Sequence, residues 1–130
     1  MISLLNIATV AIGGGLGASL RFLMNYSITS RFPQIYFPLA TFFINVLGCF
    51  CIGAIGGLSS RWGFPDTIRL FLATGILGGF TTFSSFGIET ITLIRGGHIT
   101  EAFLYVFGSV LCGCAAVFVA LLMTEPHITP

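Results

Sequence analysis

A polar, glycine-containing stretch interrupts an apolar segment that is long enough to cross a membrane. Segment 70–88 has no charged residue, and its centre, residues 78–86, reads GGFTTFSSF. A span that only had to lie in lipid would need neither the glycine pair nor the four hydroxyl groups. Backbone groups freed at membrane depth are tolerated only where protein or a cavity satisfies them. The pattern therefore predicts a membrane helix broken near its centre, as in transport proteins that hold ions with helix ends and unwound carbonyls.

The rest of the chain also has the composition of a membrane protein. Of its 130 residues, 55% are hydrophobic and 7% are charged, and the mean hydropathy is +1.03. Soluble domains carry about 25% charged residues. Because a spanning helix needs about 20 mostly apolar residues, we expect one all-α transmembrane domain over residues 1–130. Its predicted spans are about 4–24, 38–58, 65–94 with a break near 78–82, and 102–123.

Charge is too sparse in this chain to select one orientation in the membrane. Two arginines flank the connection near residues 59–64, on the side of both termini, and three lie towards the other side. Since orientation follows the Lys/Arg bias of the loops, this split predicts that the chain inserts both ways up. Four short helices can hardly enclose a polar path alone, so we expect a homodimer. Glycines four residues apart predict close helix packing: Gly13 and Gly17, Gly53 and Gly57, Gly75 and Gly79.

Several classes of function have no support in the sequence. A net charge of +1 without any lysine offers no clustered basic face for nucleic acid. There is no Walker loop, no histidine cluster and no nucleophile beside a base, so neither an enzyme nor an ATP-driven pump is predicted. The cysteines form two C-x-C pairs, whereas metal sites favour C-x₂₋₄-C spacing. They are predicted to be small buried apolar residues: Cys49, Cys51, Cys112 and Cys114.

Polar and aromatic side chains inside the predicted spans are candidates for an ion path. Asn45 lies near the middle of the second span, where its NH₂ group offers two donors without a charge; a helix–helix hydrogen bond is its alternative role. Thr41 lies one turn earlier on the same face. Phe83 and Phe86 share a helix face, and the positive edges of their rings can host an anion. Core packing or lipid contact is the ordinary alternative for a phenylalanine.

Charged and hydroxyl groups lie around this set. Glu89 is a functional candidate because it is an acid within a span; alternatively, it reaches the interface or pairs with an arginine. Arg21 is expected near a membrane surface, where it either draws anions to an entrance or only anchors the helix. Tyr105 and Ser109, one turn apart on the fourth span, can face the same path.

These motifs resemble those of the CrcB/Fluc family of bacterial fluoride channels. The shared features are a glycine-rich run ending at Arg21, an N-x-x-G segment starting at Asn45, and residues 78–86 followed by Glu89. The resemblance covers essentially the whole chain. It implies an antiparallel, dual-topology homodimer in the bacterial inner membrane, with two separate fluoride pores.

The resemblance also implies roles for particular residues of this chain. Asn45 would donate hydrogen bonds to fluoride, and Phe83 and Phe86 would line its path with ring edges. A structural sodium ion at the dimer centre would be held by the backbone carbonyls of Gly78 and Thr81 from both subunits. Hydroxyl groups would accompany the fluoride path: Thr41, Ser84, Ser85, Tyr105 and Ser109.

The sequence leaves two alternative functions to consider. A small proton-coupled multidrug antiporter is also built from four short helices, but it needs a central membrane acid. Here the first span has no acid, and Glu89 lies off-centre. A structural subunit of a membrane complex would not explain the broken third span. The sequence therefore favours a fluoride-selective passive channel that exports cytoplasmic fluoride and gives fluoride resistance.

Overall fold

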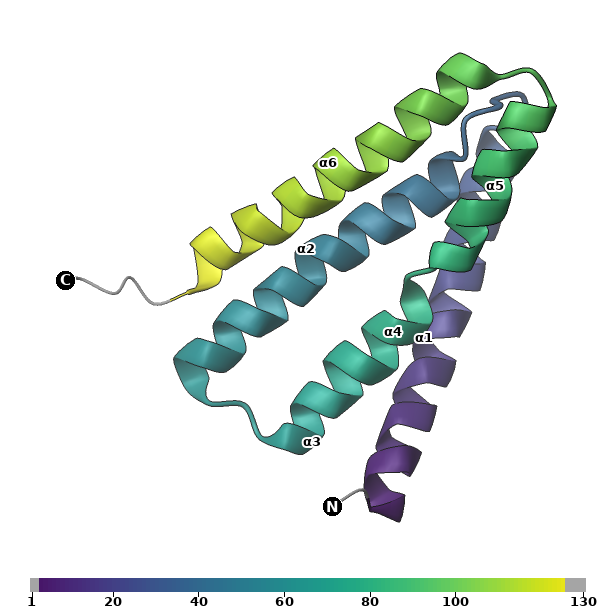
Figure 1. The fold of residues 1–130 in the computed structure, drawn as a ribbon. Coiled ribbons are helices and arrows are strands. Elements are labelled where there is room, and N and C mark those ends of the chain that lie inside the picture. The colour runs from purple at the N-terminus through teal and green to yellow at the C-terminus, as the bar shows by residue number, and fades with distance from the viewer. Residues whose placement is uncertain (1–2, 126–130) are drawn as a thin grey trace.

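The computed structural model of the chain describes residues 3–125, which contain helices and no strand. Four helical segments are long and apolar enough to cross a membrane, which confirms the predicted architecture (Figure 1). The third is divided into several pieces, as the sequence predicts. The elements are α1 (Leu4–Arg31), α2 (Leu39–Trp62), α3 (Asp66–Arg69), the π-helix η1 (Leu70–Leu77), α4 (Gly78–Phe80), α5 (Phe83–Arg95) and α6 (Ile99–Thr124).

The first helix extends further than the sequence predicts. α1 ends at Arg31 rather than at residue 24. The added residues are polar enough to lower the hydropathy, but their hydroxyls bond to their own helix: Ser27 donates to the Leu23 carbonyl at 2.8 Å. The helix stops only before Pro33, because the residue preceding a proline is disfavoured in the α conformation. Arg21 consequently lies ten residues from the helix end, about 15 Å at 1.5 Å per residue.

Glycines bring the helices together in two close pairs. α2 and α6 lie side by side, and α1 crosses η1 and α4 (Figure 1). A Cβ atom on Gly13 would lie 2.7 Å from the Phe71 carbonyl oxygen, and one on Gly53 would lie 2.7 Å from the Val117 carbonyl oxygen. Such contacts leave no room for a larger side chain. The predicted close packing at glycine pairs is therefore confirmed.

We expect Gly13→Ala to destabilise the fold by about 1–3 kcal/mol, because the new methyl group would press against the backbone of η1. Gly15→Ala is the matched control, since a Cβ atom there meets nothing within 4 Å. The measurement is the temperature at which the purified protein loses its sharp size-exclusion peak. Equal melting of both variants would show that the contact between α1 and η1 can relax without cost.

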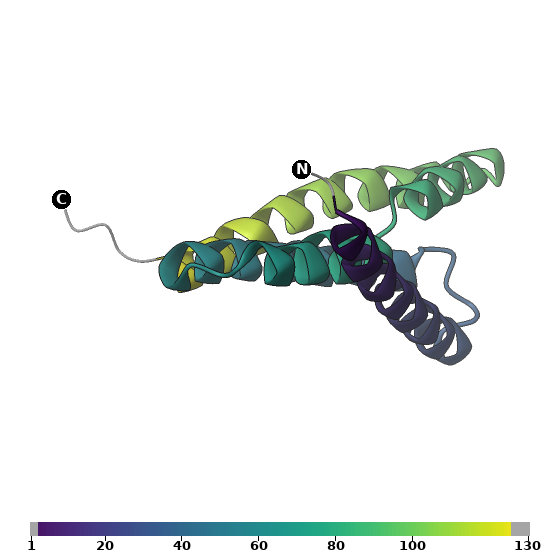
Figure 2. The ribbon, with the colours of Figure 1, turned by 90° about the horizontal axis from the view of Figure 1, so that it is seen from below.

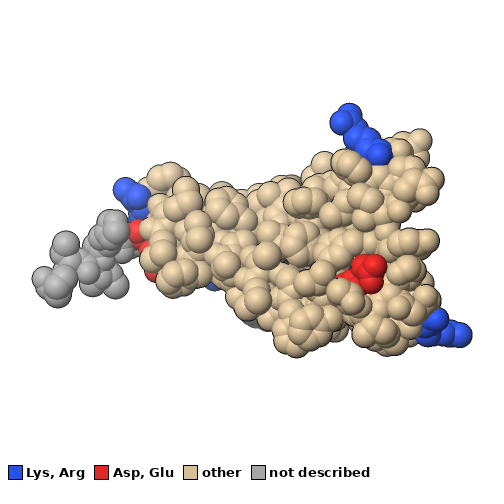
Figure 3. All heavy atoms as spheres, turned by 90° about the horizontal axis from the view of Figure 1, so that it is seen from above, with Lys and Arg blue, Asp and Glu red and all other residues tan. Residues whose placement is uncertain are grey.

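Seen from below, the C-terminal half of α1 swings away from the other helices (Figure 2). Its N-terminal half packs on η1 and α4, where the glycines permit close approach. On the face seen from above, no charged side chain shows over the middle, and the visible arginines and acids lie towards the two ends (Figure 3). This distribution fits a body that lies in the hydrocarbon of a bilayer.

The prediction that the cysteines are buried is wrong for the pair on α6. All four are free thiols; Cys112 and Cys114 are exposed, while Cys49 and Cys51 are half-buried. The reason is that Gly113, between the two exposed cysteines, is the residue that faces α2: a Cβ atom on it would lie 3.2 Å from the Cys49 sulfur. Its immediate neighbours on the helix point elsewhere.

Candidate functional site

The third span is broken at Thr81 and Thr82, whose backbones are extended. The Thr81 N–H still donates to the Leu77 carbonyl, at 3.0 Å, and so completes the last turn before the break. Thr82 then acts as the N-cap of α5, since its hydroxyl oxygen accepts the Ser85 N–H at 3.2 Å. The break lies within the predicted range 78–82.

Asn45 of α2 holds the break open through two hydrogen bonds to one residue. Its Nδ2 donates to the Thr82 carbonyl at 3.0 Å, and its Oδ1 accepts the Thr82 N–H at 2.8 Å. In a continuous α-helix that N–H would donate to the carbonyl of Gly78. Asn45 therefore replaces a helical bond and leaves the Gly78 carbonyl without this partner. One N–H of the carboxamide remains for another acceptor.

Gly48, the glycine of the N-x-x-G motif, also contributes to the structure of the break. A Cβ atom on Gly48 would collide with the side chain of Thr81. Gly48 thus makes room for Thr81, while Asn45, one turn earlier on α2, binds Thr82. Asn and Gly are three residues apart in the motif because Asn45 contacts Thr82 and Gly48 contacts Thr81, two adjacent residues of the break that both face α2.

Arg21 lies at the break of the third span. Its Nη1 donates to the Thr81 carbonyl at 3.3 Å in a partly buried contact. Because α1 continues to Arg31, Arg21 lies within the helix and not at its end; its predicted place near a membrane surface stays a prediction. Its guanidinium brings a positive charge to the unwound segment.

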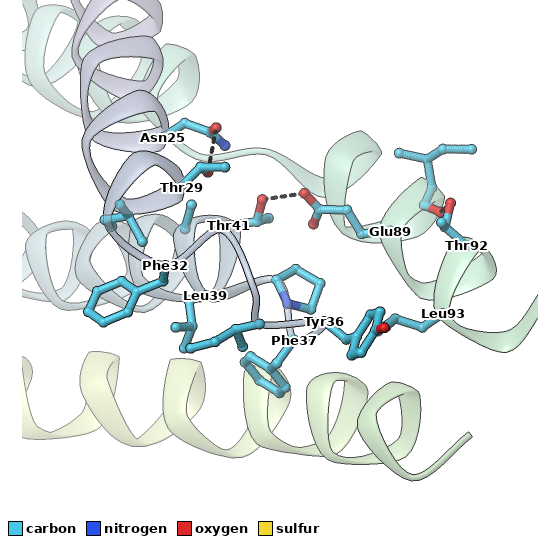
Figure 4. Close-up of a pocket in the computed structure, with 15 residues that line it drawn as sticks. Asn25, Thr29, Phe32, Tyr36, Phe37, Leu39, Thr41, Glu89, Thr92 and Leu93 are labelled. Carbon is cyan, nitrogen blue, oxygen red and sulfur yellow. Dashed lines mark hydrogen bonds between the residues drawn. The ribbon is translucent and has the colours of Figure 1, made fainter. Parts of the chain in front are cut away.

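Glu89 of α5 lies in a hydrogen-bonded group with two other predicted residues. One carboxylate oxygen accepts the Thr41 hydroxyl at 2.7 Å (Figure 4). The other accepts the Tyr105 hydroxyl, also at 2.7 Å. Thr41 and Tyr105 are fully buried. Within residues 3–125, Glu89 forms no ion pair with an arginine. It is therefore held by hydroxyl groups inside the protein, and the alternative of an arginine partner is not observed.

The aromatic residues form a row that leads from this group to the surface of the chain. The ring centroids of Phe83 and Phe86 are 5.5 Å apart, and those of Phe86 and Tyr105 are 5.1 Å apart. Phe83 is 84% exposed, which is unusual for the end of a row of packed rings. The two phenylalanines share a face, as their spacing predicts.

A cavity of about 450 Å³, here called the central cavity, brings together several of the predicted residues. Its lining includes Asn45, Phe83, Phe86 and Ser109, and it contains no charged side chain. The Ser109 hydroxyl is buried and has no hydrogen-bond partner among residues 3–125. A buried polar group without a partner costs about 1–3 kcal/mol, so this hydroxyl points to something that occupies the cavity.

The predicted serines of the third span lie on the other side of the break. Ser84 and Ser85 line a second cavity, of about 510 Å³, together with Arg21. The serine hydroxyls lie 3.3 and 3.1 Å from that of Thr82. Thr82 lines both this cavity and the central one. Thr82 therefore belongs to the site together with Ser84 and Ser85, and it lies there because it caps α5.

Comparison with known proteins agrees with these features. Residues 8–121 match the family described as "CrcB-like protein, Camphor Resistance (CrcB)". Three similar proteins are each named "Fluoride-specific ion channel FluC". The protein of Novosphingobium aromaticivorans is 46% identical over 115 residues, which cover 88% of this chain and 91% of the relative. That of Azobacteroides pseudotrichonymphae is 43% identical over 117 residues (89% and 93%). That of Helicobacter pylori strain G27 is 40% identical over 119 residues (91% and 92%). With most of its length matched, the chain belongs to the CrcB family.

Proposed function

We propose that the chain is a fluoride-selective passive ion channel of the bacterial inner membrane and not an enzyme. The observation that carries this proposal is the central cavity, where the Asn45 carboxamide, two phenylalanine rings and the unpartnered Ser109 hydroxyl meet without a charged group. The name shared by its relatives supports the same ion.

The chemistry of the cavity suits a small, strongly hydrated anion. Fluoride enters a narrow pore only if donors replace its water. Within the described part of the chain, one N–H of the Asn45 carboxamide and the Ser109 hydroxyl have no hydrogen-bond partner. The edges of the Phe83 and Phe86 rings carry partial positive charge. Because no lysine or arginine lies in the cavity, binding is weak enough for release.

Export needs no coupled energy source. Fluoride enters a cell as neutral HF and dissociates inside. A membrane potential that is negative inside then drives the anion outward by about 2.3 kcal/mol per 100 mV. A passive pore is therefore sufficient to lower cytoplasmic fluoride and to give resistance.

A second copy of the chain would complete the pore. The Phe83 ring is 84% exposed, and a Cβ atom on Gly87, one turn later, would meet nothing within 4 Å. An open face of this kind at membrane depth, beside a polar cavity, is suited to a partner subunit. The nearly even arginine split supports an antiparallel partner, so we propose a dual-topology homodimer with two pores.

The backbone of the break suits a sodium ion at the centre of this dimer. The Gly78 carbonyl has lost its helical partner to Asn45, and the Thr81 carbonyl accepts the Arg21 guanidinium at a long 3.3 Å. Unwound carbonyls are typical ligands of Na⁺ in transport proteins, and a carbonyl oxygen has two lone pairs. We propose that Gly78 and Thr81 of both subunits hold the ion, which would supply positive charge where the broken ends meet.

The proposed antiparallel arrangement predicts two populations of the C-terminus. A tag placed there should be accessible from both sides of the inner membrane, in about equal amounts, because the loop charges provide almost no bias. Protease digestion of right-side-out and inside-out vesicles measures this. Protection of the tag in one vesicle type alone would rule out dual topology.

Glu89→Gln separates the channel from a proton-coupled antiporter. An antiporter would lose all transport with this change, because it would lose the acid for which protons and cations compete. In the channel, glutamine keeps an acceptor for one of the two hydroxyl donors. We expect fluoride flux to fall by about tenfold or less, which corresponds to about 1.4 kcal/mol. Complete loss from an intact dimer would count against the channel.

Growth of a bacterium without its own fluoride exporter tests the proposed function in a cell. Expression of the chain should restore growth in fluoride medium that stops the parent strain. The Phe83→Ile variant, expressed to the same level, should not restore growth. No difference between the wild type and an empty vector, with the protein present in the membrane, would contradict the proposal.

A further inference from the structure

The C-terminal half of α1 carries a polar stripe that extends outward from Arg21. Arg21, Asn25 and Thr29 follow one another at four-residue spacing and so share a helix face. Asn25 and Thr29 are exposed. Polar side chains within a membrane span face the protein interior or a water-filled cavity, because lipid cannot satisfy them. The stripe is therefore suited to a polar environment beside α1.

Two cavities provide that environment where α1 diverges from α5 (Figure 2). The break-side cavity, of about 510 Å³, contains Arg21, Thr82, Ser84 and Ser85. The loop-side cavity, of about 310 Å³, is bounded by residues 35–41 and by Glu89 and Thr92 of α5. Two residues line both cavities: Asn25 and Thr29. Asn25 and Thr29 therefore lie where the loop-side cavity meets the break-side cavity.

The carboxamide of Asn25 is oriented by its neighbour on the stripe. The Thr29 hydroxyl donates to Asn25 Oδ1 at 3.4 Å, so the oxygen is turned towards Thr29 (Figure 4). The NH₂ group is turned away from it and makes no hydrogen bond to any residue between 3 and 125. Asn25 therefore presents donors without a partner at the point where the two cavities meet.

We propose that this cleft is the entry route for the anion and that Asn25 is a binding residue within it. The inference rests on the proposed fluoride channel. The anion passes from the loop-side cavity, past the NH₂ group of Asn25, to the positive charge of Arg21. Thr82, which lines both the break-side and the central cavity, marks where the route reaches the pore.

The lining of the cleft assigns Asn25 a role in rate and not in selectivity. The two cavities are lined by many polar and charged side chains, among them Arg21, Thr41, Ser85 and Glu89, so the anion keeps much of its hydration there. Discrimination against chloride belongs to the central cavity, where phenylalanine rings and the Asn45 carboxamide must replace the water around the ion. Changes at Asn25 should therefore alter flux and leave the preference for fluoride unchanged.

Asn25→Asp tests this in the full-length protein reconstituted into liposomes. The new carboxylate would lie one turn from Arg21 and offset its charge, so fluoride release should slow by about tenfold at low salt. At 1 M of an impermeant salt, where the screening length is about 3 Å, most of the rate should return. Asn25→Leu removes the carboxamide, donor and acceptor together, without adding a charge, and should slow release by about threefold at both salt concentrations.

Ser30→Asp is the matched control, because it places the same charge near the same end of α1 but lines neither cavity. Its release rate should stay within about twofold of the wild type. Wild-type rates for both Asn25 variants, in proteins that elute as intact dimers, would overturn the inference while leaving the channel itself standing. So would equal slowing by Asn25→Asp and Ser30→Asp. If the wild type releases no fluoride, the proposed function fails, and this inference fails with it.

Discussion

Phe83→Ile is expected to reduce fluoride release by about 100-fold, which corresponds to a barrier increase of about 2.7 kcal/mol. Isoleucine keeps an apolar side chain at the mouth of the central cavity but removes the ring edge that can face an anion. Phe83 is suited to this test because its side chain is 84% exposed, so the fold of the subunit does not depend on it. The measurement is the initial rate of release from liposomes that contain equal amounts of protein.

Phe118→Ile controls for the loss of any aromatic ring from the membrane surface of the protein. Phe118 is 62% exposed on α6 and lines none of the cavities described above. Its replacement should leave release unchanged. If Phe83→Ile and Phe118→Ile behave alike, the ring of Phe83 does not interact with the ion. Phe86 is less informative, because it packs against Tyr105 and its loss would disturb the core.

Asn45→Leu is expected to abolish measurable release and also to destabilise the protein. Leucine has nearly the same size but cannot bind the Thr82 backbone, so one N–H and one carbonyl would lose their partners. Each unsatisfied buried group costs about 1–3 kcal/mol. The Thr82 N–H could recover a bond only by turning to Gly78, which would close the break. Thermal unfolding and fluoride release, measured on the same preparation, test both effects.

Asn45→Asp separates the effect on fluoride release from the effect on stability. Aspartate keeps an acceptor for the Thr82 N–H but loses the donor to the Thr82 carbonyl, so part of the stability should remain. Its negative charge beside the central cavity would repel fluoride, and release should still be lost. An Asn45→Leu protein with the melting temperature and flux of the wild type would show that the contact with Thr82 is dispensable.

The broken third span could be predicted because its cause is local. A glycine pair and four hydroxyls within an apolar segment conflict with a simple lipid-spanning helix, and the structure breaks at Thr81 and Thr82. The close glycine contacts were predictable for the same reason, since only small residues allow helices to approach within lipid. The end of α1 was not predictable from hydropathy, because residues 25–31 are polar but still helical.

The hydrogen-bond partners of the polar residues depend on where helices that are distant in sequence cross. These crossing points cannot be read from the sequence. Asn45 was identified as a buried amide, but its pairing with Thr82 arises only where α2 meets the break. Arg21 was identified as a candidate, but its hydrogen bond to the Thr81 carbonyl arises only where α1 crosses the third span. Ser84 and Ser85 follow Phe83 directly, yet they line the break-side cavity, whereas Phe83 lines the central one. Neighbours on a helix point to different faces.

Fluoride release from liposomes tests the account most directly. The purified wild-type protein is reconstituted with fluoride inside, and valinomycin is added so that K⁺ carries the balancing charge. A fluoride electrode should record rapid release, and the same vesicles loaded with chloride should release none. Absence of fluoride release from a well-folded dimer, or equal release of chloride, would contradict a selective fluoride channel built on Asn45, Phe83 and Phe86.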